Sequence, residues 1–181
     1  LENADDPRHI LFVERRSKWE LVRSRLSYIA KNMSQQQGGT SDEAKRISRL
    51  NHEAFLLYIR QDNKRYIKKQ LANITNIDFQ ESTTGSCALH AAVGRNNIGL
   101  VDQLINKRGA DVYLTDANGI NALMIAAGSN RLEIAKLILD HPSVKHGTLI
   151  HERDEEHRNA LHFAARRGYT SMVKLLLKHG V

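Results

Sequence analysis

The sequence predicts an all-α fold in which short helix pairs stack into a solenoid behind an N-terminal helical segment. Three similar segments recur in the second half, and their shared leucines, Leu89, Leu123 and Leu161, are 34 and 38 residues apart. Self-similarity at this period is typical of repeat proteins. A polar break and a second apolar stretch follow each segment, which indicates two helices in every unit.

Small residues in the first helix of each unit allow neighbouring helices to approach closely, and leucine or isoleucine in the second helix fills the space between layers. The small pairs are Ala91-Ala92, Ala126-Ala127 and Ala164-Ala165. Residues that tolerate a positive φ stand between the two helices, at Asn96, Asn130 and Gly168. Gly109 and Gly180 are expected to end second helices in the same way.

The repeated segments resemble the ankyrin repeat across about residues 82–181. They read Gly85-Ser-Cys-Ala-Leu-His-Ala-Ala-Val93, Gly119-Ile-Asn-Ala-Leu-Met-Ile-Ala-Ala127 and His157-Arg-Asn-Ala-Leu-His-Phe-Ala-Ala165, and Gly109-Ala-Asp-Val112 follows the first. The resemblance implies an ankyrin-repeat solenoid of helix-turn-helix pairs with β-hairpin connections. Its units are 82–115, 116–153 and a truncated 154–181.

Several positions depart from the family pattern. Cys87-Ala88, Asn121-Ala122 and Asn159-Ala160 replace the usual Thr-Pro, and an asparagine there can still cap the helix. Arg108 is one residue too many before Gly109. The connection His141–Glu152 is enlarged, so we expect an irregular hairpin there, either a distorted finger or a specialised contact.

A degenerate unit at 51–81 precedes the three. Leu56 lies 33 residues before Leu89, Leu71 and Ile77 continue the apolar pattern, and bulky residues replace the small pair. The whole repeat domain is therefore predicted at 51–181. An atypical terminal unit is common in such stacks.

Residues 1–50 are predicted as a helical N-terminal segment. A helical stripe covers 9–31, a polar, glycine-containing linker lies near 32–40, and Thr40-x-x-Glu43 indicates a capped helix carrying Ile47, Leu50 and Ala54. We expect this segment to seal the open end of the stack. A further divergent helix pair, or a separate module, is the alternative.

The net charge of +7 raises the question of a nucleic-acid partner. The excess of basic residues is +4 over 1–81 and +3 over 82–181, without a basic stripe interleaved with aromatic residues, so nucleic-acid binding is not expected. One cysteine, Cys87, excludes an internal disulfide, and no apolar run is long enough to span a membrane. We expect a cytoplasmic or nuclear protein, and a piece of a longer one because the chain begins at Leu1 and stops within a unit.

Neither an enzyme active site nor a metal or cofactor site is predicted. The histidines at 141, 146, 151 and 157 lack metal-ligand spacing, and His90 and His162 stand where the resemblance implies a structural hydrogen bond near the hairpin. Cys87 and His90 suggest a nucleophile and its base, but both occupy standard repeat positions.

The predicted function is protein–protein interaction, by a scaffold within a larger protein. The alternative is a regulatory or substrate-recruiting domain of an enzyme, channel or microbial effector. The resemblance implies that the partner binds a concave face of hairpin tips and first helices. We assign to it Arg95, Tyr113, Asn118, Ile120, Arg131, Glu155, Glu156, Arg158, Phe163, Arg166, Arg167 and Tyr169. Tyr113, Tyr169, Arg166 and Arg167 are favoured because tyrosine and arginine dominate interface energies. The sequence indicates no particular partner or oligomeric state.

Overall fold

The computed structural model describes residues 41–144 and 148–180, and the chain divides into two compact units, 1–54 and 55–181. The helix predicted over 9–31, the linker near 32–40 and Thr40 lie outside the described residues, as do the side chain of Glu43 and His146. The N-terminal seal, which rests on the helix at 9–31, stays a prediction.

The helix α2 runs from Ser41 to Arg60, so the predicted boundary at residue 50 falls inside a continuous helix. Its part in the first unit carries Ile47, Leu50 and Ala54 in helical conformation, as the sequence predicts. Arg49 and Glu53 form an exposed ion pair of 3.1 Å one turn apart. Such pairs stabilise a helix by a few tenths of a kcal/mol, about 0.3.

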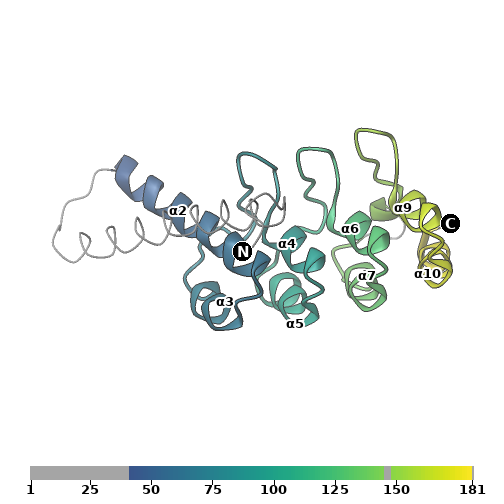
Figure 1. The fold of residues 1–181 in the computed structure, drawn as a ribbon, viewed down its shortest axis with the longest axis horizontal. Helices are drawn as coiled ribbons and strands as arrows, with labels where there is room; N and C mark the ends of the chain where they lie inside the picture. The colour runs from purple at the N-terminus through teal and green to yellow at the C-terminus, as the bar shows by residue number, and fades with distance from the viewer. Residues whose placement is uncertain (1–40, 145–147, 181) are drawn as a thin grey trace, which may run out of the picture. The chain divides into compact units, whose positions relative to one another are not determined.

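The second unit is a stack of helix pairs, which confirms the all-α prediction (Figure 1). The end of α2 precedes α3 (Lys64–Leu71), and α4 (Ala88–Gly94) precedes α5 (Ile98–Asp102), which continues as the π-helical η1 (Gln103–Lys107). The next pair is α6 (Ala122–Gly128) and α7 (Leu132–Leu139), and the last is α9 (Ala160–Arg166) and α10 (Thr170–Gly180).

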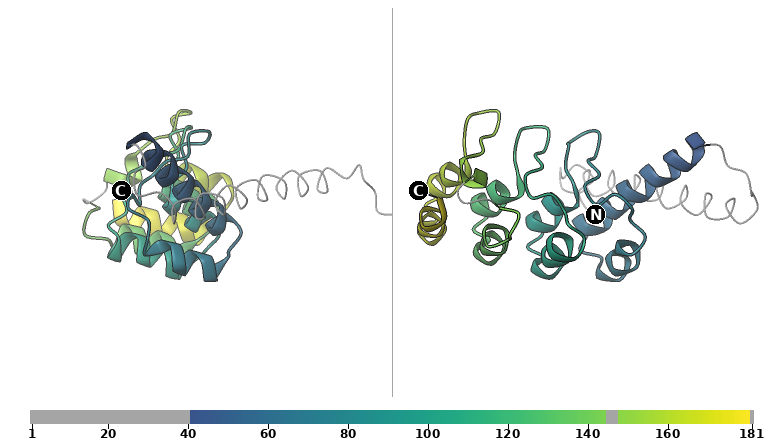
Figure 2. Two further views of the ribbon diagram at one scale, coloured as in Figure 1. Left: turned by 90° about the vertical axis from the view of Figure 1, so that its left-hand side faces the viewer. Right: turned by 180° about the vertical axis from the view of Figure 1, so that it is seen from behind.

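Figure 2 shows the same arrangement from the side and from behind. The first helices α4, α6 and α9 form one row, and the second helices α3, α5, α7 and α10 form another. We call them the inner and outer rows. Loops project from the inner row. In the described residues, β pairing is limited to one antiparallel bridge between Thr115 and Asn121. The two arms of each loop are too short to form a longer β ladder.

The turns within the pairs adopt the left-handed conformation that the sequence predicts. Asn96, Asn130 and Gly168 have φ values of 57°, 55° and 70°, and Asp62 takes the same role in the first pair with 53°. Gly109 ends η1 with a φ of 64°. The prediction for Gly180 is wrong, because this glycine is the last residue of α10 and has no positive φ.

The core lies where the two rows meet and where successive inner helices touch. Ala92, Ala126 and Ala164 have no exposed surface, since α6 packs directly against α4 and α9. The prediction of paired small residues holds only in part: Ala91 is half-buried and Ala165 is exposed. The outer row contributes the large buried side chains Leu104, Ile105, Ile134, Ile138, Met172 and Leu176.

The extra residue before Gly109 is absorbed by η1. A π-helical turn accommodates one additional residue without breaking the helix. The amide of Arg108 donates to Gln103 O at 3.1 Å, and its guanidinium donates to the carbonyl oxygens of Leu71 and Ile74 at the end of the preceding pair. The extra residue, Arg108, therefore connects its own helix pair to the preceding pair.

The enlarged connection contains a short helix, α8 (Thr148–His151). Leu149 and Ile150 are buried, with 1% and 2% of their surfaces exposed, and α8 packs against α9 and α10. Ala110 and Val112 fill the corresponding place after the previous pair. Part of the enlarged connection therefore packs into the core of the unit, and a projecting loop follows it.

Candidate partner-binding face

Three projecting loops form one edge of the second unit, and we call them fingers 1 (78–86), 2 (111–120) and 3 (152–158) (Figure 1). Carboxylates shape the last two tips. One carboxylate oxygen of Asp116 accepts from the amides of Asn118 and Ile120 at 2.9 and 3.0 Å. Asp154 accepts from the amides of Glu156 and Arg158 at 3.1 and 2.8 Å. These side chains replace the ladder hydrogen bonds of a longer hairpin.

Backbone hydrogen bonds connect neighbouring fingers. The amide of Ala117 donates to Thr84 O at 2.9 Å, and the amide of Glu155 donates to Asn118 O at 3.1 Å. A Cβ atom on Gly85 would lie 2.6 Å from the amide nitrogen of Ala117, so only glycine permits this approach. The fingers therefore form a continuous edge.

His90 connects finger 2 to the inner row. Its Nε2–H donates to Leu114 O at 2.9 Å, and its Nδ1 accepts from the amide of Cys87 at 3.2 Å. Burial lowers the pKa of His90 below its usual value of 6.5 and raises the pKa of the Cys87 thiol. In the described residues the His162 ring has local contacts with Asn159: its Nδ1 lies 3.3 Å from the Asn159 amide nitrogen and 2.6 Å from the Asn159 Oδ1.

The surroundings of Cys87 and His90 favour a structural role over that of a nucleophile and its base. The two side chains are 3.4 Å apart, but the thiol is buried and its raised pKa keeps it protonated at neutral pH. The Nδ1 atom of His90 is already engaged with the backbone. The hydrogen-bonding role implied by the resemblance therefore accounts for His90.

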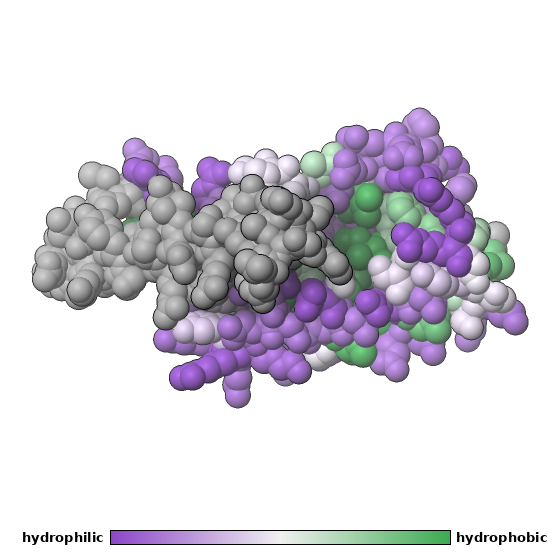
Figure 3. Space-filling model, viewed as in Figure 1, coloured by the Kyte–Doolittle hydropathy of each residue, from purple (hydrophilic) through white to green (hydrophobic). Residues whose placement is uncertain are grey.

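A hollow with apolar surface lies between the fingers and the inner helices α6 and α9 (Figure 3). Ile120, Ile125 and Phe163 are half-buried. Phe163 reaches across to α6, where a Cβ on Gly128 would lie 3.4 Å from its ring. The absence of a side chain at Gly128 therefore leaves the ring room.

Arg158 is committed to finger 3. Its guanidinium forms ion pairs with Asp154 at 2.7 Å and Glu156 at 2.6 Å, and lies 4.9 Å from the centre of the Phe163 ring. Burial would raise the pKa of Asp154, but the hydrogen bonds and charge of Arg158 hold it below its usual 3.8. Arg158, Glu156 and Phe163 thus form one cluster beside the hollow.

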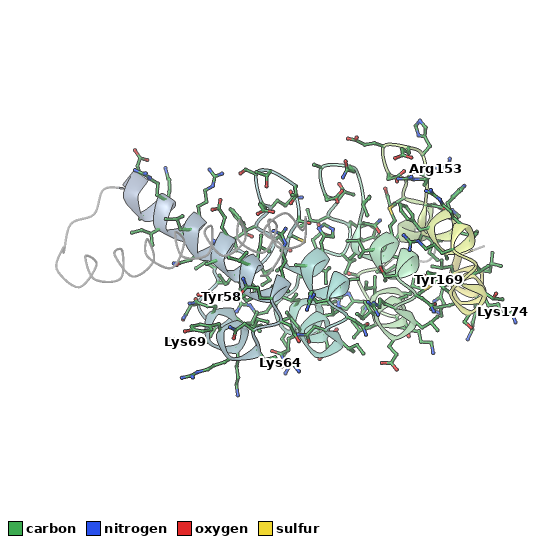
Figure 4. The ribbon with its side chains drawn as sticks, viewed as in Figure 1. Tyr58, Lys64, Lys69, Arg153, Tyr169 and Lys174 are labelled. Atoms are coloured by element: carbon green, nitrogen blue, oxygen red, sulfur yellow. The ribbon has the colours of Figure 1, made fainter. Side chains whose placement is uncertain are left out.

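The other predicted site residues occupy different parts of the unit. Arg95, Arg166 and Arg167 are exposed at the ends of α4 and α9. Tyr169 is half-buried in the turn that leads to α10 (Figure 4). Asn118 and Glu155 are exposed on adjacent finger tips, where backbone atoms join them.

Two of the predicted site residues, Tyr113 and Arg131, lie beside α8 and at the start of α7, respectively, rather than at a finger tip. The hydroxyl groups of Tyr113 and Thr148 are 2.9 Å apart, which connects finger 2 with α8. Arg131 stands at the N-cap position of α7, and its buried Nε finds no hydrogen-bond partner among the described residues. Contact of these two residues with a partner stays a prediction.

Charge is segregated between fingers and helices, which summing over sequence halves does not reveal. The three fingers contain eight acidic and two basic residues, whereas the remainder of 55–181 contains four acidic and fifteen basic residues. The acidic edge is hydrophilic in Figure 3. Folding places this edge on one side of the apolar hollow, and Arg95, Arg166 and Arg167 mark the helix ends.

Within 41–144 and 148–180, no three histidine, cysteine or acidic side chains are grouped closely enough to hold a metal ion. None of the helices described there combines the length and apolar character needed to cross a membrane. A surface cavity of about 400 Å³ is lined by Leu139, Asp140, His141, Pro142, Val144, Ile150 and His179.

Stacked helix pairs with linked fingers define a helical repeat protein. The chain belongs to the ankyrin repeat family, since a family model of three ankyrin repeats matches residues 52–148 and 89–181. The Notch-regulated ankyrin repeat-containing proteins of Xenopus tropicalis and Homo sapiens are each 33% identical to it over 84 residues. These matches cover 45% of this chain and 73% of each relative. Protein A of that name from Danio rerio is 32% identical over the same length.

Proposed function

We propose that this chain is a protein-interaction module that binds its partner across the fingers and the exposed side of the inner helices. The observation that carries the proposal is the apolar hollow between the acidic finger edge and the inner helices α6 and α9, with exposed Arg166 and Arg167 at the end of α9. Ankyrin repeats are in general protein–protein interaction modules, and the fingers and inner helices offer several layers for one partner to contact.

Arg166 and Arg167 are the strongest contact residues in this proposal. Both are exposed, and the ion pairs in the described part of 55–181 involve other residues. Arginine is enriched where a few residues dominate binding energy. Phe163, three and four residues before them, supplies apolar surface on the same helix, and Ile120 supplies it on finger 2.

The module serves either as a scaffold or as the regulatory or substrate-recruiting part of an enzyme, channel or microbial effector. Its single cysteine is a buried thiol, which fits a reducing compartment such as the cytoplasm or nucleus. Binding rather than catalysis is the role that this face supports.

The test is affinity capture with the immobilised 1–181 chain, quantified by mass spectrometry. We expect the double change Arg166→Ala and Arg167→Ala to reduce recovery of the main captured protein at least about tenfold. Adding Tyr169→Ala should reduce it further. Because Tyr169 is half-buried, only the double variant separates binding from folding.

The matched control is Lys174→Ala with Lys178→Ala, which removes the same charge from exposed positions on the outer helix α10. The control should capture as the original chain does, and all variants should keep their melting temperatures within a few degrees, about 3 °C. Equal recovery by the double variant and the original chain would remove this face as the binding site.

A further inference from the structure

The outer helix α3 presents four exposed basic side chains within eight residues. Lys64 and Lys68 lie one turn apart, as do Arg65 and Lys69, so together they cover one side of the helix, away from the buried Ile67. We call Lys64, Arg65, Lys68 and Lys69 the α3 cationic face. Figure 4 shows Lys64 and Lys69 on this helix.

This arrangement is unfavourable for the helix itself. Like charges one turn apart repel each other, and Lys64 and Arg65 stand in the first turn, where the helix dipole disfavours positive charge, although it favours Lys68 and Lys69 in the last turn. No acidic residue occupies that turn. Helix α7 follows the stabilising pattern instead, with Glu133 in its first turn and Lys136 in its last.

No ion pair in the described part of 55–181 offsets this repulsion, because the ion pairs there are made by other residues. Packing of α3 depends on Ile67 and on Tyr66, whose ring stacks on Tyr58 at a centroid distance of 4.8 Å. A local arrangement that lowers stability without an internal gain is typical of functional sites.

We propose that the α3 cationic face binds an acidic segment of a partner protein. A helix of eight residues is about 12 Å long, which about four residues of an extended chain span. Carboxylates on such a segment complement the four cations. Tyr66, 39% exposed on the same helix, adds an aromatic contact at the edge of the face.

Nucleic acid and anionic membranes match the α3 cationic face less well than an acidic protein segment does. The neighbouring outer helix α5 contains no lysine or arginine, and the next exposed cations of the outer row, such as Lys107 at the end of η1 and Lys136 on α7, are single residues rather than a dense stripe along which a phosphate backbone would lie. One face of Tyr66 is covered by Tyr58, which limits base stacking. A bilayer site needs apolar side chains that can insert beside the cations, whereas the two aliphatic residues of α3, Ile67 and Leu71, are buried and half-buried.

The experiment uses the 1–181 chain and a fluorescein-labelled peptide of four consecutive glutamates within a Gly-Ser flank, with binding measured by fluorescence polarisation. The α3 variant changes Lys64, Arg65, Lys68 and Lys69 to Gln. The control variant changes Lys107, Lys136, Lys174 and Lys178 to Gln, four exposed positions elsewhere in the outer row. Both variants lose the same charge.

We expect the α3 variant to bind the peptide about tenfold more weakly than the original chain, and the control less than about twofold. Binding should weaken as salt is added. The variant should unfold at the same denaturant concentration as the original chain, or higher, since the repulsion is gone. Arg166→Ala with Arg167→Ala should leave peptide binding unchanged, so this site is tested independently of the concave face.

Four results would overturn the proposal. The first is no peptide binding by the original chain, and the second is equal weakening in both variants, which would reflect net charge alone. The third is tighter binding, through the same four residues, of a single-stranded oligonucleotide or of vesicles containing phosphatidylserine. The fourth is self-association in sedimentation that only the α3 variant loses, which would make a second copy the occupant.

Discussion

The guanidinium of Arg108 donates to the carbonyl oxygen of Leu71, so that a residue following one outer helix closes the end of the preceding one. The same group also reaches Ile74 O. A cation at a helix C-terminus interacts favourably with the dipole and satisfies carbonyls that lack a helical partner. The π-helical turn η1 brings Arg108 into this position.

Replacement of Arg108 by alanine should lower the free energy of unfolding by about 2 kcal/mol, because two carbonyl oxygens lose a charged donor. Arg108→Lys should restore only part of the loss, since one ammonium group cannot reproduce the planar fork. Urea denaturation followed by circular dichroism measures both. The exposed neighbour Lys107→Ala is the control, and an equal loss there would contradict the assignment.

A methyl group added at Gly85 or Gly109 would strain the backbone at both positions but would meet a steric clash at Gly85 alone. Both have a positive φ, 65° and 64°, but only a Cβ on Gly85 would meet the next finger. Gly109→Ala should therefore cost about 1 kcal/mol for the left-handed conformation, and Gly85→Ala about 3 kcal/mol because Ala117 must also move. Thermal unfolding of the two variants gives the comparison. Equal destabilisation would show that fingers 1 and 2 separate easily.

Protonation of His90 should destabilise the fold. Its folded pKa lies below the unfolded value of 6.5, so the unfolded state binds more protons as pH falls through 6.5. Stability should then decrease by up to about 1.4 kcal/mol per pH unit until the folded pKa is reached. Urea titrations at a series of pH values between neutrality and mild acid measure the slope. The His90→Gln variant should show a shallower slope, and an identical one would exclude His90 as the cause.

Asp154 should stabilise finger 3 with the same pH direction as His90, but over a more acidic range. Its folded pKa is depressed, so its contribution is complete above the unfolded value of 3.8 and is lost as pH falls through the folded pKa. Asp154→Ala should cost about 2 kcal/mol at neutral pH through lost backbone hydrogen bonds. Asp154→Asn retains an acceptor oxygen and should cost less. Hydrogen exchange at the Arg158 amide reports the change directly, and unchanged protection in Asp154→Ala would contradict it.

The turns show how far local chemistry reaches. Asn96, Asn130 and Gly168 adopt positive φ as predicted, because the steric tolerance of a residue is a property of that residue. Gly180 does not, since tolerance of the left-handed conformation does not compel it and Gly180 is itself the last helical residue of α10. The same limit applies to Ala91 and Ala165. Their small size permits close packing, but no neighbouring helix fully covers them.

The candidate site was predictable as a surface, but not in its detail. Arg158 and Arg166 look alike in sequence, yet one is held by Asp154 and Glu156 while the other is exposed. The acidic finger edge was not predicted. Three fingers that are far apart in the chain form it together, whereas the net charge summed over consecutive residues combines the fingers with the basic helices between them.

By itself the sequence determined the family, the helix pairs and most of the left-handed turns of this protein, because periodicity and steric tolerance are local and recur in every repeat. Tertiary structure alone decided which charges are neutralised and which are presented. Arg108 reaches the pair before it, Arg60 forms an ion pair with Glu81 of finger 1, and the cations of α3 have no carboxylate partner in the described part of 55–181. The first two contacts join elements that approach each other only once the repeats have stacked.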